Sequence, residues 1–299
     1  MSLGYILAIT AGLFYGLLSL AYKWADVRKA RSAHFTFILS ITGALVSLTK
    51  SLSEESIWDD PRLWMLGGVM GLVIVAGIFA LLAANRQGPV YTSWTIINVS
   101  FLFAILLSIV LLDEKLLCVD PINLIVFSIA LYFFVHGMKR TTAAGREAYH
   151  VWKHAGLLLL VFIFNGLATF GSKLKFTFWA HANTSALPTL FYLCSALLSL
   201  ALIFREERRI RFTRDELKTG FAAGILISIG TIIFLTAMSL PAAAVFTICQ
   251  GVSLTSGVLL NTLVGREKLN LWTILGLFTG LILLFLVIFR EPLARWVCG

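Results

Sequence analysis

The sequence has few charged residues. Asp, Glu, Lys and Arg make up only 13% of its 299 residues, and 59% are hydrophobic, whereas soluble domains have about 25% charged and about 45–50% apolar residues. This composition excludes an ordinary soluble globular protein. Long apolar runs fill the chain instead, and a membrane helix with its connection takes roughly 30 residues. The length therefore predicts about ten membrane-spanning helices.

Acidic residues are scarcer than basic ones, so the formal net charge is +9. A positive charge can indicate nucleic-acid binding, but the Lys and Arg residues stand in short groups between apolar runs, which is typical of cytoplasmic loops. We therefore expect membrane lipids, and no nucleic acid, next to these groups.

Cysteine is also scarce, and its positions show no C-x-x-C spacing. This pattern predicts neither a metal site nor a disulfide framework, and no cofactor is expected. The four cysteines are Cys118, Cys194, Cys249 and Cys298.

Apolar runs of membrane-spanning length recur along the whole chain. They cover about 3–22, 33–50, 63–84, 91–112, 120–138, 154–173, 187–204, 217–239, 242–263 and 271–289. The first run has no basic leader and no A-x-A-like cleavage site, so we expect a span and not a removable signal peptide. Closed β-barrels are the alternative in a membrane, but their strands are about ten residues long and alternate strictly. The sequence therefore predicts an all-α polytopic membrane protein with ten transmembrane helices.

The two halves of the chain resemble each other. Shifts of 150 and 153 residues align Tyr15-Gly16-Leu17 with Asn165-Gly166-Leu167, Ser19 with Thr169, Lys23 with Lys173, Gly67 and Gly71 with Gly220 and Gly224, and Glu114-Lys115-Leu116 with Glu267-Lys268-Leu269. We interpret the chain as two five-helix repeats, 1–138 and 154–299, joined by the polar linker 139–153. Because five is odd, the second repeat must enter the membrane in the opposite orientation. Such inverted repeats are typical of alternating-access carriers. The G-x-x-x-G pair in each repeat predicts a close approach between helices.

The basic residues divide unequally between the two membrane sides. Of the 24 Lys and Arg residues, 17 fall on one side of the predicted topology and 7 on the other. The positive-inside rule then places both termini outside the cytoplasm. The most basic connection, 205–218, contains Thr213 followed three residues later by Glu216, a capping-box signal for the start of the eighth helix.

Uncharged polar and aromatic residues interrupt several apolar runs. Such residues either form hydrogen bonds between helices or line a mixed polar and aromatic cavity for a small organic solute. The candidate substrate-binding residues of this kind are Tyr15, Ser19, Tyr22, Asn85, Tyr91, Trp94, Asn98, Asn165, Thr169, Gln250 and Ser253.

Lys23 and Lys173 recur as a matched pair near helix ends. Inversion of the repeats places them at opposite mouths of the bundle. They either extend to the lipid headgroups or attract an anionic group of the solute, and we include both among the candidate substrate-binding residues.

The spans lack the residues that an enzyme in the membrane would need. No Asp or Glu lies in the middle of a predicted span, and none of the five His residues stands in an H-E-x-x-H or comparable pattern. Without a candidate acid–base pair or nucleophile, the sequence predicts no catalytic residue and no enzyme.

These patterns resemble the EamA-like family of the drug/metabolite transporter superfamily, whose members have two tandem five-helix repeats. The resemblance lies in the aromatic-Gly pair followed by lysine, Tyr15-Gly16 and Lys23, its second copy Asn165-Gly166 and Lys173, and the signatures Asp113-Glu114-Lys115-Leu116 and Gly265-Arg266-Glu267-Lys268-Leu269. It implies a central cavity lined mainly by helices one, three and four of each repeat. Many members of the family have cytoplasmic termini, which is opposite to the orientation given by the charge count.

The sequence as a whole predicts a carrier in the cell inner membrane. It would move a small organic metabolite by alternating access around a central cavity. The alternatives are a flippase for lipids or lipid-linked sugars, an enzyme within the membrane, or a scaffold. The sequence leaves open the identity of the solute, the direction of transport and the coupling ion. It also leaves open the oligomeric state, for which a homodimer is one alternative.

Overall fold

The computed structural model describes residues 3–52, 60–87, 90–113, 117–142, 151–180, 182–206, 211–240, 242–265, 271–289, 292–294 and 296. All regular secondary structure in these ranges is helical, which confirms the predicted all-α class. The helices are α1 (Leu3–Val27), α2 (Ser32–Ser51), α3 (Pro61–Gln87), α4 (Val90–Val99), α5 (Phe101–Leu112), α6 (Asp120–Thr142), α7 (Val151–Phe178), α8 (Ala186–Glu206), α9 (Arg214–Ala237), α10 (Ala242–Gly265) and α11 (Leu271–Ile288).

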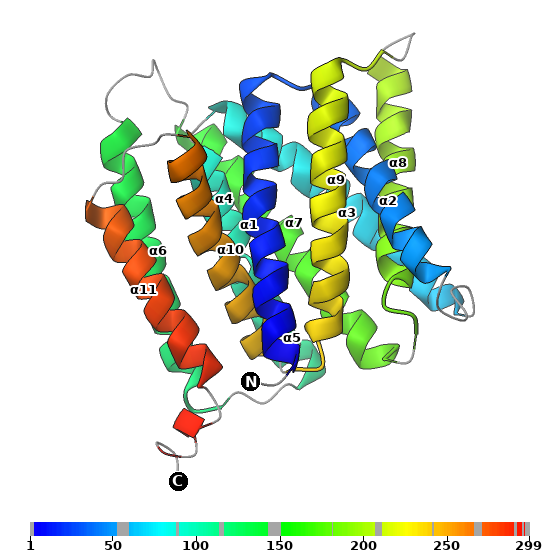
Figure 1. Ribbon diagram of the computed structural model, residues 1–299. Helices are drawn as coiled ribbons and strands as arrows, with labels where there is room; N and C mark the ends of the chain where they lie inside the picture. The colour runs from blue at the N-terminus through cyan, green and yellow to red at the C-terminus, as the bar shows by residue number, and fades with distance from the viewer. Residues whose placement is uncertain are drawn as a thin grey trace.

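The helices form one bundle whose axes run roughly parallel or antiparallel (Figure 1). Eight helical segments in the described part of the chain are long and apolar enough to cross a membrane, and α4 together with α5 provides one of them, Ser93–Leu112. The described residues thus support a multi-pass membrane protein. Helix α1 begins and helix α11 ends at the same end of the bundle (Figure 1).

Neighbours in the bundle come mostly from opposite halves of the sequence. Helix α1 packs between α9 and α10, and α2 packs between α8 and α9. Helix α3 contacts α7 and α8, while α7 also contacts α4 and α5. Helices α6 and α11 pack against each other at one edge of the bundle (Figure 1). Because the core lies between the two halves, a cavity there is formed jointly by both.

Glycines allow the closest approaches between these helices, as the G-x-x-x-G pairs predict. A Cβ on Gly71 of α3 would lie 2.6 Å from the Cβ of Cys194 in α8. A Cβ on Gly224 of α9 would likewise lie 2.6 Å from the Cβ of Thr42 in α2. Carbon atoms in contact normally lie about 3.5–4.0 Å apart. Only glycine therefore fits at either crossing without moving the helices.

A break at Ser100 divides one predicted span into α4 and α5. The Ser100 hydroxyl donates to the carbonyl of Ile97 at 2.6 Å. The Asn165 amide of α7 donates to the same carbonyl at 3.0 Å and to the Ser100 hydroxyl oxygen at 2.6 Å. These polar side chains replace backbone hydrogen bonds, and the membrane interior tolerates a break only where such partners exist. The sequence predicts one continuous helix over 91–112, because the run has membrane-spanning length and contains no proline or glycine.

An ion pair joins α9 to the connection between α1 and α2. The Nε and Nη2 atoms of Arg31 donate to the Glu216 carboxylate at 2.8 and 3.0 Å, and Arg28 pairs with Asp215. Thr213 and Glu216 form the predicted capping box. This end of the bundle is therefore fixed by charged contacts.

The opposite end has a different contact. The indole N–H of Trp179, which follows α7, donates to the Asp60 carboxylate, which precedes α3. This hydrogen bond lowers the pKa of Asp60 below its ordinary value, because it stabilises the ionised carboxylate.

One prediction near a helix end needs correction. Cys118 is disulfide-bonded, although the scattered cysteines suggested no disulfide; Cys194 and Cys249 are free thiols. The sequence spacing gave no signal for this bond because a disulfide depends on distance in the fold. Helix α6 continues to Thr142, and α7 begins at Val151, so both helices extend into the predicted linker 139–153. Residues 143–150 lie outside the described ranges.

Candidate solute-binding cavity

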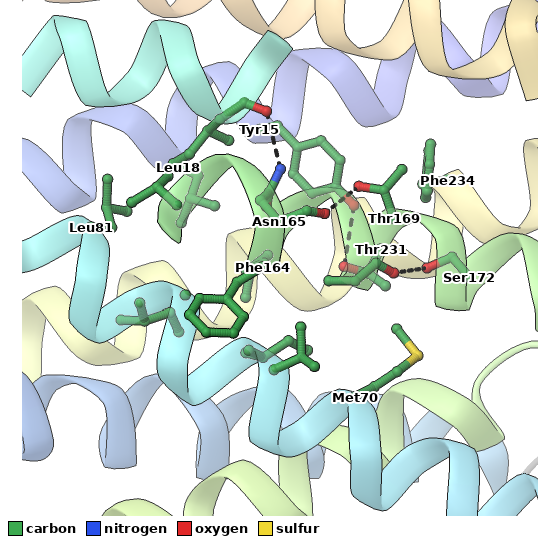
Figure 2. A pocket seen from close by; sticks show the side chains of 18 of the residues that line it. Tyr15, Leu18, Met70, Leu81, Phe164, Asn165, Thr169, Ser172, Thr231 and Phe234 are labelled. Atoms are coloured by element: carbon green, nitrogen blue, oxygen red, sulfur yellow. Dashed lines mark hydrogen bonds between the residues drawn. The ribbon is translucent and has the colours of Figure 1, made fainter. Parts of the chain in front are cut away.

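The core of the bundle contains a cavity of about 160 Å³ (Figure 2). This volume is below the roughly 300–1,000 Å³ of sites for drug-sized ligands, and it suits a small organic solute. Helices α1, α3, α4, α7, α8, α9 and α10 contribute to the lining. The lining residues are Tyr15, Leu18, Tyr22, Met70, Val73, Ile74, Gly77, Ile78, Leu81, Trp94, Ile97, Val161, Phe164, Asn165, Ala168, Thr169, Ser172, Phe191, Tyr192, Ile227, Thr231, Phe234, Gln250 and Ser253.

The lining has an apolar wall and a more polar one. All of the residues that α3 contributes are apolar, from Met70 to Leu81. Polar side chains come instead from α1 and from α7 to α10. A solute with an apolar body and a polar end would match this division.

The lining is also free of charge. Among the described residues that surround the cavity, none is Asp, Glu, Lys, Arg or His. Ion pairing or proton transfer by a lining side chain is therefore not available there. Hydrogen bonds and apolar contacts are the interactions that this lining can offer to a solute.

Three hydroxyl groups form a cluster in the polar wall, which we call the hydroxyl cluster: Tyr15, Thr231 and Tyr192. The Tyr15 and Tyr192 hydroxyls lie 3.2 and 3.3 Å from the Thr231 hydroxyl oxygen. The three residues come from α1, α8 and α9, so helices from both halves must pack correctly to bring them together. The cluster joins α1 of the first half to α8 and α9 of the second half within the polar wall.

Asn165 places a second polar group at the cavity through its contact with the break at Ser100. Its amide donors are used by the Ile97 carbonyl and the Ser100 hydroxyl. Ile97 itself lines the cavity. Thr169 donates to the backbone carbonyl of Asn165 at 2.8 Å, which leaves its hydroxyl oxygen as an acceptor. The break next to the lining residue Ile97 is thus held by a side chain from the other half.

The structure brings seven of the candidate residues together around this cavity. They are Tyr15, Tyr22, Trp94, Asn165, Thr169, Gln250 and Ser253. They come from four different helices, α1, α4, α7 and α10.

The other candidates lie outside the lining. Ser19 is buried between α1 and α10, where it accepts a hydrogen bond from Asn261 at 2.9 Å. Asn98 is fully buried, and its amide donates to the carbonyl of Trp94 at 2.8 Å. Asn85 is buried in α3 near its C-terminal end. The side chain of Tyr91 lies outside the described residues.

Neither of the paired lysines lines the cavity. Lys23 is half-buried near the end of α1, and Lys173 is buried in α7, with its ammonium nitrogen 6.0 Å from the ring centre of Phe176. Lys23 follows the lining residue Tyr22, and Lys173 follows Ser172. Each lysine therefore stands beyond the cavity on its own helix.

Comparison with known proteins identifies a family for the N-terminal half of the chain. The profile of the EamA-like transporter family matches residues 2–136. The N-terminal half of the chain belongs to the EamA-like transporter family. No curated protein matches the chain significantly. One solved structure, described only as the crystal structure of a protein, is similar over 99% of this chain and 98% of its own, with a TM-score of 0.76 and 17% sequence identity. At that identity the similarity shows a shared fold over the full length.

The EamA-like match covers α1 to α6 almost completely, including the α3 wall and the break at Ser100. Three polar lining residues were not among our candidates: Ser172, Tyr192 and Thr231. Ser172 stands 150 residues after Tyr22, so the shift that aligns the halves could have found it. Tyr192 and Thr231 lie in apolar runs next to no motif, and only helix packing turns them toward the cavity.

Proposed function

We propose that this protein is a carrier that moves a small organic metabolite across the cell inner membrane by alternating access. In this proposal, residues 1–138 and 154–299 form two inverted five-helix repeats joined by the linker 139–153. The observation that carries the proposal is a cavity between the two halves of a membrane helix bundle, whose described lining residues carry no charge. The EamA-like family match of the N-terminal half supports it.

The helix contacts support the repeat. In the proposed repeat, α1 corresponds to α7, α2 to α8, α3 to α9, and α4 together with α5 to α10. If each helix is exchanged for its counterpart, the contact of α1 with α9 becomes the contact of α7 with α3. The same exchange turns the contact of α1 with α10 into that of α7 with α4 and α5, and the contact of α2 with α9 into that of α8 with α3. A bundle built from two equivalent repeats would have this property.

The glycine contacts support the same equivalence at the level of single residues. Gly71 meets Cys194 and the carbonyl of Phe191, whereas Gly224, which stands 153 residues after Gly71, meets Thr42 and the carbonyl of Leu39. Cys194 stands 152 residues after Thr42, and Phe191 stands 152 residues after Leu39. The two crossings thus use corresponding residues with the halves exchanged.

The cavity lining follows the same relation. Lining residues that correspond under shifts of 150 or 153 residues are Tyr15 and Asn165, Leu18 and Ala168, Tyr22 and Ser172, Ile74 and Ile227, Ile78 and Thr231, Leu81 and Phe234, and Ile97 and Gln250. A solute in this cavity would contact both repeats, which is the arrangement that lets rocking of one repeat against the other change access.

The contacts at the two ends of the bundle support alternating closure. Arg31 and Glu216 join the halves at one end, and Trp179 and Asp60 join them at the other. Opening one end would require separation of its own contact only. A scaffold needs no cavity, so the presence of one argues against that alternative. An enzyme would need an acid–base pair at the cavity, and the described lining residues provide none.

Counterflow uptake into proteoliposomes tests the proposal. Vesicles that contain the purified full chain are loaded with one metabolite at a time and supplied with a trace of the same labelled compound. We expect transient accumulation for at least one small organic solute in a broad panel. Protein-free vesicles are the control for leakage. If no solute accumulates above that control, while scrambling of a labelled lipid does occur, the protein is a flippase and the carrier proposal is wrong.

A further inference from the structure

We infer that the cavity selects an uncharged organic solute that has an apolar body and a polar end bearing a carbonyl or hydroxyl group. This inference rests on the proposed function, because it names the chemical class of the solute for the same cavity. Three observations carry it: the absence of charge in the described lining, the apolar wall of α3, and a set of hydrogen-bonding groups without partners.

The hydroxyl cluster has more hydrogens than it can use. Tyr15, Thr231 and Tyr192 each supply one hydroxyl hydrogen, and the two hydrogen bonds within the cluster use two of them. Within the described part of the chain, none of the three hydroxyls makes another hydrogen bond. At least one hydroxyl hydrogen is therefore available to an acceptor in the cavity.

Two further groups on α4 and α10 point to the same requirement. The indole nitrogen of Trp94 is buried without a hydrogen-bond partner among the described residues, and it can only donate. The Gln250 side chain is 6% exposed, and its amide forms no hydrogen bond with the residues that the structure describes. Leaving buried polar groups unpaired is unfavourable, so a solute that accepts hydrogen bonds gains affinity at this site. The Gln250 oxygen adds an acceptor for a solute donor.

Charge on the solute has no counterpart among the described residues that line the cavity. An ion that leaves water for a membrane interior loses its hydration, and the loss is recovered only by an opposite charge or by many well-placed dipoles. The two lysines, Lys23 and Lys173, lie beyond the lining. An uncharged carbonyl or hydroxyl group satisfies the unpartnered donors without that loss.

Binding of three compounds of one shape tests the inference. Benzamide, benzoate and benzamidinium share a ring and a planar substituent but are neutral, anionic and cationic near neutral pH. Their dissociation constants are measured by titration calorimetry on the purified full chain. We expect benzamide to bind at least about tenfold more tightly than either ion. Equal or tighter binding of benzoate or benzamidinium, or no binding of benzamide up to its solubility limit, overturns the inference.

Matched variants of α9 assign the hydrogen bond. Thr231→Val keeps the side-chain shape but removes the hydroxyl, and we expect it to weaken benzamide binding about fivefold. Thr231→Ser restores the hydroxyl and should restore affinity. The control is Thr236→Val on the same helix, where the exposed hydroxyl donates only to the carbonyl of Ile232 at 2.9 Å. Equal loss in the two valine variants would show that Thr231 makes no contact of its own with the compound.

A charge placed in the lining tests the electrostatic part. Gln250→Glu adds a carboxylate at nearly constant shape, and we expect the preference to move from benzamide to benzamidinium. If this variant does not fold, the Thr231 series and the three-compound comparison decide. Counterflow separates the two proposals. If benzamide binds but no compound in the panel shows counterflow, the selectivity stands and the carrier proposal is refuted. If ions are transported in preference to neutral compounds, the carrier proposal stands and the selectivity is refuted.

Discussion

The glycine crossings allow a prediction whose size follows from the structure. In α3, Gly68 and Gly71 are one turn apart but differ in surroundings. A Cβ on Gly71 would lie 2.6 Å from the Cβ of Cys194 and 2.9 Å from the carbonyl oxygen of Phe191. A Cβ on Gly68 would have no heavy atom within 4 Å. Because one of the atoms against Gly71 is backbone, a side-chain rotation cannot relieve the overlap.

Replacing each glycine with alanine should therefore have opposite effects. Gly68→Ala should stabilise the protein by about 0.5–1 kcal/mol, because alanine loses less conformational freedom in a helix. Gly71→Ala gains the same stabilisation from the smaller loss of conformational freedom, but its added Cβ forces α3 and α8 apart by about 1 Å. Overpacking of this kind costs about 1–3 kcal/mol. The neighbouring variants should differ by about 2 kcal/mol.

Denaturant unfolding of the purified variants in one detergent measures this difference, and Gly68→Ala serves as the control for Gly71→Ala. Gly224→Ala adds a test of the repeat, since a Cβ there would lie 2.6 Å from both the Cβ of Thr42 and the carbonyl oxygen of Leu39. It should cost as much as Gly71→Ala. If Gly71→Ala is as stable as Gly68→Ala, the close packing of α3 on α8 is wrong. If only Gly224→Ala is tolerated, the two crossings are not equivalent.

Three further predictions concern the cavity, its mouths and the orientation. Asn165→Ala should destabilise the protein by about 1–2 kcal/mol, because the break at Ser100 loses two hydrogen bonds; unchanged unfolding would show that the Ser100 hydroxyl alone supports it. Lys23→Met and Lys173→Met should leave initial uptake of a neutral solute within about twofold, because neither lysine lines the cavity and methionine keeps an apolar stem, and a larger fall in either folded variant would assign that lysine to the solute path. Single cysteines placed in the basic connection 205–218 should resist an impermeant thiol reagent in intact cells, since the positive-inside rule puts this connection in the cytoplasm. Ready labelling there would reverse the orientation.

Composition and periodicity alone determined the fold class. Apolar runs of spanning length can satisfy their backbone in lipid only as helices, so the all-α membrane bundle follows from the sequence without tertiary information. The glycines at 67, 71, 220 and 224 marked the close crossings in advance, because a missing side chain is visible in the sequence. Thr213 and Glu216 also gave a local signal that the structure confirms, since a capping box involves only neighbouring residues.

The side chains that reach the cavity depended on helix rotation and packing, which a helix-length apolar run does not specify. Asn98 and Gln250 have similar polarity and nearly equivalent places in the two halves, yet Gln250 lines the cavity and Asn98 turns back to the carbonyl of Trp94. Tyr192 and Thr231 gave no sequence signal, because a hydroxyl in an apolar run is as compatible with a helix contact as with a binding site. Their meeting with Tyr15 joins three helices that are far apart in the chain. Only tertiary packing brings such groups within hydrogen-bond distance, because a hydrogen bond requires about 3 Å between atoms and the sequence fixes no distance between separate helices.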